Sequence, residues 1–70
     1  MTRRAYDSLS PAETRVLALL ATGLTNRAMA TRLGVSIHTV RSHVTHIYEQ
    51  LDVHSRVDAA LAAQRLGVAQ

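Results

Sequence analysis

The chain of 70 residues contains no cysteine, lysine, tryptophan or phenylalanine. Without cysteine it has neither a disulfide framework nor a thiolate metal site, which fits a reducing cytoplasm. Its only aromatic residues, Tyr6 and Tyr48, offer no platform on which RNA bases would stack. No apolar run reaches the ~18 residues of a membrane span, and no apolar stretch follows the N-terminus. We therefore expect a soluble, untargeted cytoplasmic protein.

Size and charge narrow the class of protein further. Seventy residues form one small domain, too short for a large core or a deep substrate pocket. The formal net charge is +3, and all eight basic residues are arginine. Arginine stays charged and its planar guanidinium suits phosphates and guanine edges. A charge of +3 alone is weak support for a polyanionic partner, because abundant alanine and arginine are also typical of a GC-rich genome.

The stretch from Asn26 to Leu51 has the layout of a helix-turn-helix unit. Two short apolar patterns of helical spacing are separated by Gly34-Val35-Ser36. Ala30 is small, as required where the second helix crosses close to the first. Gly34 ends the first helix, because glycine enters the left-handed conformation at no steric cost, and Ser36 caps the next helix. This combination favours a helix that lies in the major groove of DNA.

Capping signals delimit the helices. Ser10-Pro11-Ala12-Glu13 has the pattern of a capping box, and Gly23 ends the helix that it starts. Thr25 caps a second helix, which runs to Leu33. The residues that these two helices should bury are Val16, Leu17, Leu19, Leu20, Met29, Ala30 and Leu33.

Two more helices follow the turn, and no segment alternates for long enough to form a strand. The third helix runs from about Ile37 to Leu51, and the fourth starts at Ser55, capped together with Asp58, and ends at Gly67. We expect residues 1–8 to be a flexible tail and residues 9–68 to be the folded domain. The predicted fold is all-α, a four-helix bundle that contains a helix-turn-helix.

Five motifs resemble those of the C-terminal effector domain of LuxR/NarL-type bacterial transcription regulators. They are Leu9-Ser10-Pro11-Ala12-Glu13, Gly23-Leu24-Thr25-Asn26, Ala30-Thr31-Arg32-Leu33, Thr39-Val40-Arg41-Ser42-His43-Val44 and Ser55-Arg56. The resemblance covers roughly residues 9–68. It implies a four-helix bundle whose third helix contacts DNA and whose fourth often forms a dimer contact. Some members carry this domain behind a phosphorylated receiver or a ligand-binding domain.

Candidate base contacts lie on the outward side of the third helix. Arg41 projects from its first third, where side chains reach base edges. Its sharpest use would be a bidentate contact to guanine O6 and N7, and a phosphate contact is the alternative. Ser42, Thr45 and His46 share this side and complete the predicted set. For Ser42 and Thr45 the alternative is simple solvation. Thr45 and His46 depart from residues common in the family, so the resemblance predicts no particular target sequence.

Candidate phosphate contacts lie near helix N-termini, where backbone amides and hydroxyls suit phosphate oxygens. This set comprises Asn26, Arg27, Ser36, His38, Thr39 and Arg56. Helix capping is the alternative for the residues at helix starts, and for Ser36 both roles are compatible. For Arg56 the alternative is an ion pair with Asp52 or Asp58.

The four histidines do not form the pattern of a metal site. His43 and His46 are spaced i, i+3, but no cysteine or acidic cluster completes the three or four ligands that zinc needs. We expect no metal or cofactor, and interpret His43 as a packed histidine whose ring nitrogens bond to backbone groups. A triad of Ser42, His43 and Asp52 is excluded because Ser42 and His43 point about 100° apart on a helix. No enzymatic activity is predicted.

The fourth helix has apolar residues on both sides. Val57, Ala60 and Leu61 fall on one face, and the opposite face carries Ala59, Ala62, Ala63 and Leu66. Because a single small core buries only one face, we predict that the second set is the interface of a symmetric homodimer. The alternative is that alanine is simply a good helix former.

The sequence therefore predicts a domain that binds specific sites on double-stranded DNA in bacterial transcription regulation, as a dimer. The expected partners are DNA, a second copy through the C-terminal helix and, in a longer regulator, an upstream receiver or ligand-binding domain and RNA polymerase. Two other classes remain: a protein-interaction module that uses the apolar C-terminal helix, and an RNA-binding protein, which the lack of aromatic residues disfavours.

Overall fold

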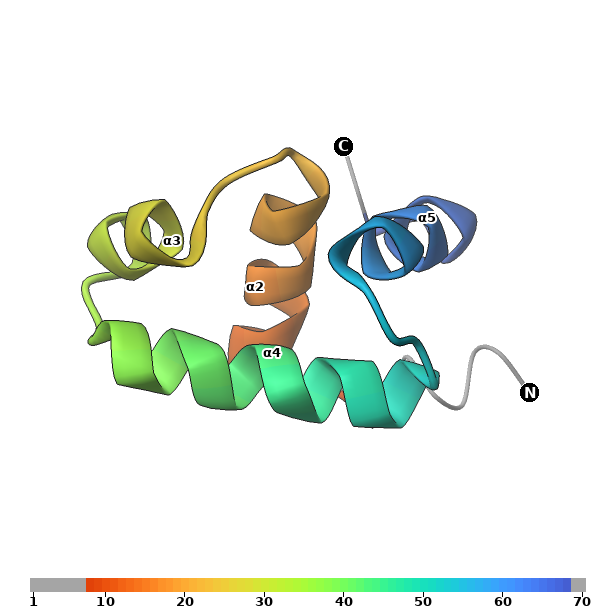
Figure 1. Cartoon of the computed structure of the whole chain (residues 1–70), viewed down its shortest axis with the longest axis horizontal. Helices are drawn as coiled ribbons and strands as arrows, with labels where there is room; N and C mark the ends of the chain where they lie inside the picture. Colours follow the sequence, from red (N-terminus) through yellow and green to blue (C-terminus); the bar gives the residue numbers. More distant parts are fainter. Residues whose placement is uncertain (1–7, 69–70) are drawn as a thin grey trace.

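The computed structural model describes residues 8–68, and in this range it contains four α-helices and no strand (Figure 1). The all-α fold is thus as predicted, while the predicted tail lies almost wholly outside the described residues. The helices are α2 (Pro11–Ala21), α3 (Asn26–Leu33), α4 (Ile37–Leu51) and α5 (Arg56–Arg65). None of these helices is long and apolar enough to cross a membrane.

Hydroxyl side chains start all four of these helices, as predicted. Ser10, Thr25, Ser36 and Ser55 each accept a hydrogen bond of 3.1 Å from the backbone N–H three residues later. At α2 the capping box is complete, because the Ser10 N–H also donates to Glu13 Oε1 at 3.1 Å. Each bond satisfies a backbone donor that the helix itself leaves unpaired.

Two left-handed residues end the helices of the helix-turn-helix unit. Gly34 has φ 70° at the end of α3, as the sequence predicts. Asp52 has φ 55° at the end of α4, a conformation that residues other than glycine adopt infrequently. Gly23 and Gly67 also have positive φ, and α2 and α5 end two residues before them. The glycines directly follow the C-cap residues Thr22 and Leu66, so they end the two helices as predicted.

The helices are arranged around α2. Figure 1 shows α4 along one side of the molecule, with α3 over its first turns, α5 over its last turns and α2 between them. The fully buried core includes Val16 and Leu17 of α2, Met29 of α3, and Val40 and Ile47 of α4. Because the buried residues of α4 lie on one side only, its opposite side is left to solvent.

One structural prediction for α5 is wrong. Ala59, Ala62 and Ala63, predicted to face outward, are buried in the described structure, and Leu66 is half-buried. Val57 and Leu61 face outward instead, with 68% and 47% of their surface exposed. The physical reason is the packing of α5 against α2: alanines let the two helices approach closely, so the small residues fill the limited space in the core.

Candidate nucleic-acid interface

The exposed side of α4 is polar and continuous. Val40, Val44 and Ile47 hold the helix against the core, while the opposite side exposes His38, Arg41, Ser42, Thr45 and Glu49. At about 100° of rotation per residue, the five positions fall within about 100° around the helix axis, so they share one face. The structure thus exposes Arg41, Ser42 and Thr45 together, as an interface with bases requires.

The turn between α3 and α4 fixes the start of this face. The left-handed conformation of Gly34 ends α3 and redirects the chain, and Ser36 caps α4. The Ser36 hydroxyl oxygen lies 3.1 Å from the Thr39 backbone nitrogen and 3.0 Å from Thr39 Oγ1. Both residues are exposed, so the capping role of Ser36 leaves its outer surface accessible. At the start of α3, Arg27 is exposed, whereas Asn26 is half-buried.

Arg56 has an internal partner that neither sequence interpretation anticipates. Its Nη2 donates to the Leu24 carbonyl oxygen at 2.9 Å and to Asn26 Oδ1 at 3.0 Å. The described structure contains no ion pair of Arg56 with Asp52 or Asp58. Arg56 therefore connects the first turn of α5 to the α2–α3 loop and the Asn26 side chain, and its Nη2 is engaged within the protein.

His46 is turned toward α2 and does not lie on the outward side of α4. Its Nδ1 lies 2.6 Å from Glu13 Oε2, and 42% of its side chain is exposed against 10% for Glu13. His43 Nδ1 lies 3.5 Å from the same carboxylate oxygen. The prediction that His46 contacts bases conflicts with this geometry, and the prediction of backbone partners for His43 is wrong, because its partner is the buried carboxylate.

Glu13 is the group whose ionisation the site alters. Burial of the carboxyl opposes ionisation and is the largest single influence on its pKa. The Ser10 backbone N–H and the rings of His46 and His43 act in the other direction, and together they hold the pKa of Glu13 below its ordinary value of 4.5. The ionised carboxylate thus connects the cap of α2 to the middle of α4.

The comparison with known protein families decides the class of this fold and interface. The model described as "Bacterial regulatory proteins, luxR family" matches residues 7–63. The chain belongs to the luxR family. This assignment confirms the resemblance seen in the sequence motifs, and it makes the chain a DNA-binding domain of transcription regulation.

Several bacterial regulators are similar to this LuxR-type domain. An HTH-type transcriptional regulator of Mycobacterium tuberculosis is 44% identical over 64 residues, which are 91% of this chain and 7% of the relative. The transcriptional regulatory protein LiaR of Bacillus subtilis and the nitrate/nitrite response regulator protein NarL of Escherichia coli are each 40% identical over 60 residues. These alignments cover 86% of this chain and 28% of each relative. The chain therefore spans less than a third of the relatives that it matches.

The LuxR-type domain offers no visible metal centre in residues 8–68. No group of three or more histidine, cysteine, aspartate or glutamate side chains in this range has the geometry to hold a metal ion. His43 and His46 both approach Glu13, but both approach the same oxygen atom through Nδ1. His43 and His46 therefore serve the link between α2 and α4.

Sequence reasoning missed the two long-range links of the site. Glu13 and His46 are 33 residues apart, and Arg56 and Asn26 are 30 residues apart. The capping-box pattern identifies Glu13, but it accounts for only one of its two carboxylate oxygens. The second oxygen of a buried carboxylate also needs a partner, and this requirement is the signal from which a cross-helix link could be suspected.

Proposed function

We propose that this LuxR-type domain binds specific sites on double-stranded DNA, with the exposed face of α4 in the major groove. The observation that carries the proposal is this face itself. Arg41, Ser42 and Thr45 lie together on a 15-residue helix that a helix-turn-helix unit presents to solvent. Arg41 makes no hydrogen bond or ion pair with any other described residue, so its guanidinium is available for a guanine edge.

Phosphate contacts would come from the starts of both helices of the helix-turn-helix unit. Arg27 is exposed at the start of α3, and Ser36, His38 and Thr39 are exposed at the start of α4. The N-terminus of a helix favours anions through its unpaired backbone N–H groups. Asn26 would contact a phosphate through its side-chain amide nitrogen, because its amide oxygen accepts a hydrogen bond from Arg56.

DNA binding is tested by titrating a labelled duplex at several salt concentrations. A random pool of duplexes is first selected on the domain, and affinity for the selected duplex is then followed by fluorescence anisotropy. With about four phosphates neutralised per monomer, the logarithm of the affinity should fall with the logarithm of the salt concentration at a slope of about −3 to −4. Equal affinity for selected and random duplexes, insensitive to salt, would contradict the proposal and favour a protein-interaction module.

Base contacts and phosphate contacts are separated by two matched arginine variants. Arg41→Ala should cost ~1–3 kcal/mol on the selected site and reduce discrimination at one base pair. Arg27→Ala should weaken binding to all sequences similarly and lower the salt slope by about one. Arg65→Ala, an exposed arginine of α5, is the control. Equal losses on selected and random DNA would show that Arg41 contacts only phosphate.

The domain would act as a homodimer through the exposed face of α5. Val57 and Leu61 are large apolar residues in contact with water, which is unfavourable in a monomer. Val57 also lines a hollow together with Ala60, Arg56, Gly23 and, from α2, Leu20 and Ala21, so a side chain of a second copy would find a mostly apolar surface. This face replaces the alanine face that the sequence indicated.

The relatives of this chain are longer proteins in which the LuxR-type domain is only one part. LiaR and NarL are more than three times as long as the aligned segment. We propose that in such a context an upstream receiver or ligand-binding domain controls access to α4 or α5 in the cytoplasm. DNA-bound dimers would then contact RNA polymerase.

A further inference from the structure

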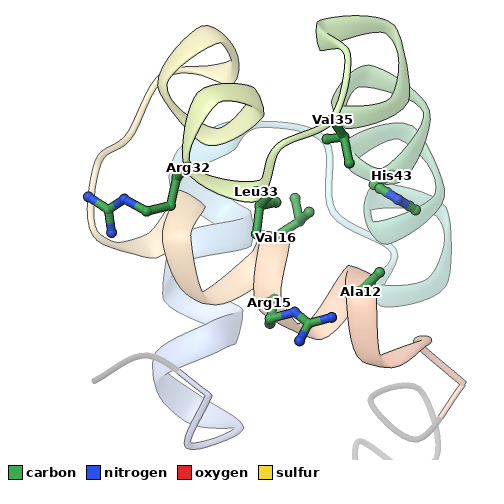
Figure 2. A pocket seen from close by; sticks show the side chains of 7 residues that line it. All are labelled: Ala12, Arg15, Val16, Arg32, Leu33, Val35 and His43. Carbon is green, nitrogen blue, oxygen red and sulfur yellow. The ribbon is translucent and has the colours of Figure 1, made fainter.

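A groove opens between the first turns of α2, the end of α3 and one flank of α4, with a volume of about 400 Å³ (Figure 2). Its apolar lining is formed by Ala12, Val16, Leu33 and Val35. Val16 is fully buried and forms the floor, whereas Val35 has 41% of its surface exposed. The groove is large enough for one or two apolar side chains and leaves Val35 in contact with water.

Two unpaired arginines give this groove a positive charge. Arg15 and Arg32 line it and are exposed, and neither makes a hydrogen bond or ion pair with another described residue. Figure 2 shows Arg15 extending toward Ala12 and Arg32 projecting outward from α3. None of the described residues that line the groove is acidic, and the nearby carboxylate of Glu13 is engaged by His46.

The groove lies away from the DNA-contacting side of α4. The residue of α4 that lines it is His43, which is two positions from Arg41 and two positions from Thr45. At 3.6 residues per turn, two positions correspond to about 160° around the helix axis. DNA bound to Arg41 and Thr45 would therefore leave this flank accessible.

We propose that the groove binds an acidic amphipathic segment of a partner protein. An apolar side chain of that segment would cover Val16, Leu33 and Val35, and its carboxylates would pair with Arg15 and Arg32. A DNA phosphate would satisfy the arginines but leave the apolar lining in water, so the combination of charge and apolar surface favours a peptide. This site goes beyond DNA binding, because it gives a DNA-bound domain a second surface for protein.

The test uses labelled peptides of about twelve residues, titrated with the domain in the absence of DNA. In the first peptide leucines are flanked by aspartates; in the second lysines replace the aspartates; in the third serines replace the leucines. The first should bind about tenfold more tightly than either of the others, since two exposed ion pairs and one apolar contact each contribute modestly. Amide chemical shifts of Val35 and His43 should move on binding.

Variants of the domain locate the peptide on the groove. Combined Arg15→Ala and Arg32→Ala should weaken the acidic peptide about tenfold, and Val35→Ser should weaken it while circular dichroism shows an intact fold. Arg65 does not line the groove, so Arg65→Ala should have no effect beyond the loss of one general positive charge.

Three results would overturn the proposal. The serine peptide could bind as tightly as the leucine peptide, which would reduce the effect to general charge attraction. A second contradicting result would be that none of the three peptides binds to the domain. Finally, the double arginine variant could lose as much DNA affinity as Arg27→Ala, with duplex DNA displacing the peptide, which would assign the groove to the DNA interface. DNA titrations of the same variants keep this outcome separate from a failure of the proposed function.

Discussion

At the scale of single residues, Glu13 combines a local role with a long-range one. Its first carboxylate oxygen accepts from the Ser10 N–H and closes the cap of α2. Its second oxygen accepts from His46 on α4 at 2.6 Å. Glu13, a residue that is 8% exposed as a whole, thus meets both requirements of a buried carboxylate, a hydrogen-bond partner for each oxygen and a nearby group able to carry positive charge.

Glu13→Gln should separate these two roles. Glutamine can still complete a capping box, but it removes the charge that the histidines face. We expect a loss of about 1–2 kcal/mol in the free energy of unfolding near neutral pH, measured by urea denaturation. Glu49→Gln, an exposed glutamate on the same helix as His46, is the control and should change stability little.

The pH dependence of this loss follows from the lowered pKa of Glu13. Because the folded value lies below 4.5, the ionised carboxylate stabilises the fold above the unfolded pKa, and this contribution disappears as pH falls through the folded value. The difference between parent and Glu13→Gln should therefore be present at pH 7 and shrink in strong acid. A difference that persists unchanged to about pH 3 would show that charge has no part in it.

Among single residues, the sequence predicts local contacts but not long-range ones. Caps at Ser10, Thr25, Ser36 and Ser55 are predictable because donor and acceptor are three residues apart. The partner of His46 cannot be predicted in this way, because the way in which α2 crosses α4 determines which group lies beside the ring. Helical spacing puts His46 on the polar side of α4, but it does not tell which part of that side another helix covers.

At the scale of elements, α5 shows the limit of hydrophobic periodicity. Both of its faces are apolar, so the pattern cannot say which one is buried. The larger side chains of Val57 and Leu61 suggest a core by size, yet the structure buries Ala59, Ala62 and Ala63. The choice depends on the space beside α2, whose large residues Leu17 and Leu20 are themselves buried. For α4, which has one apolar and one polar face, the same reasoning predicts the bounds Ile37–Leu51 correctly.

Two adjacent glutamate substitutions test which face of α5 is inside. Ala62→Glu would place a charge in the core and should cost more than about 3 kcal/mol, enough to unfold much of so small a domain. Leu61→Glu replaces an exposed side chain and should leave the thermal unfolding transition of the monomer nearly unchanged. If Leu61→Glu were instead the less stable variant, the face with Ala62 would be the outer one.

At the scale of the whole molecule, the same Leu61→Glu variant tests the dimer. Around a two-fold axis the substituted charge would face its own copy, so cooperative binding to two adjacent half-sites should fall while binding to a single half-site stays the same. Binding curves on both duplexes and sedimentation give the comparison. Thr31→Glu, which adds the same charge to an exposed position of α3, is the matched control. Undiminished cooperativity would exclude this face of α5 as the interface.

The central position of α2, which packs against α3, α4 and α5, has a consequence for how the molecule opens. Amide hydrogens exchange with solvent either when one segment detaches or when the whole domain unfolds. We expect α3 and α5, at opposite ends of α4 (Figure 1), to detach separately. The amides of α2 that lie beside Leu17 would then exchange only through complete unfolding, so their protection measures the stability of the entire domain. Helix α2 contributes no proposed DNA contact, yet its stability would in this way determine how long the DNA-binding face stays assembled.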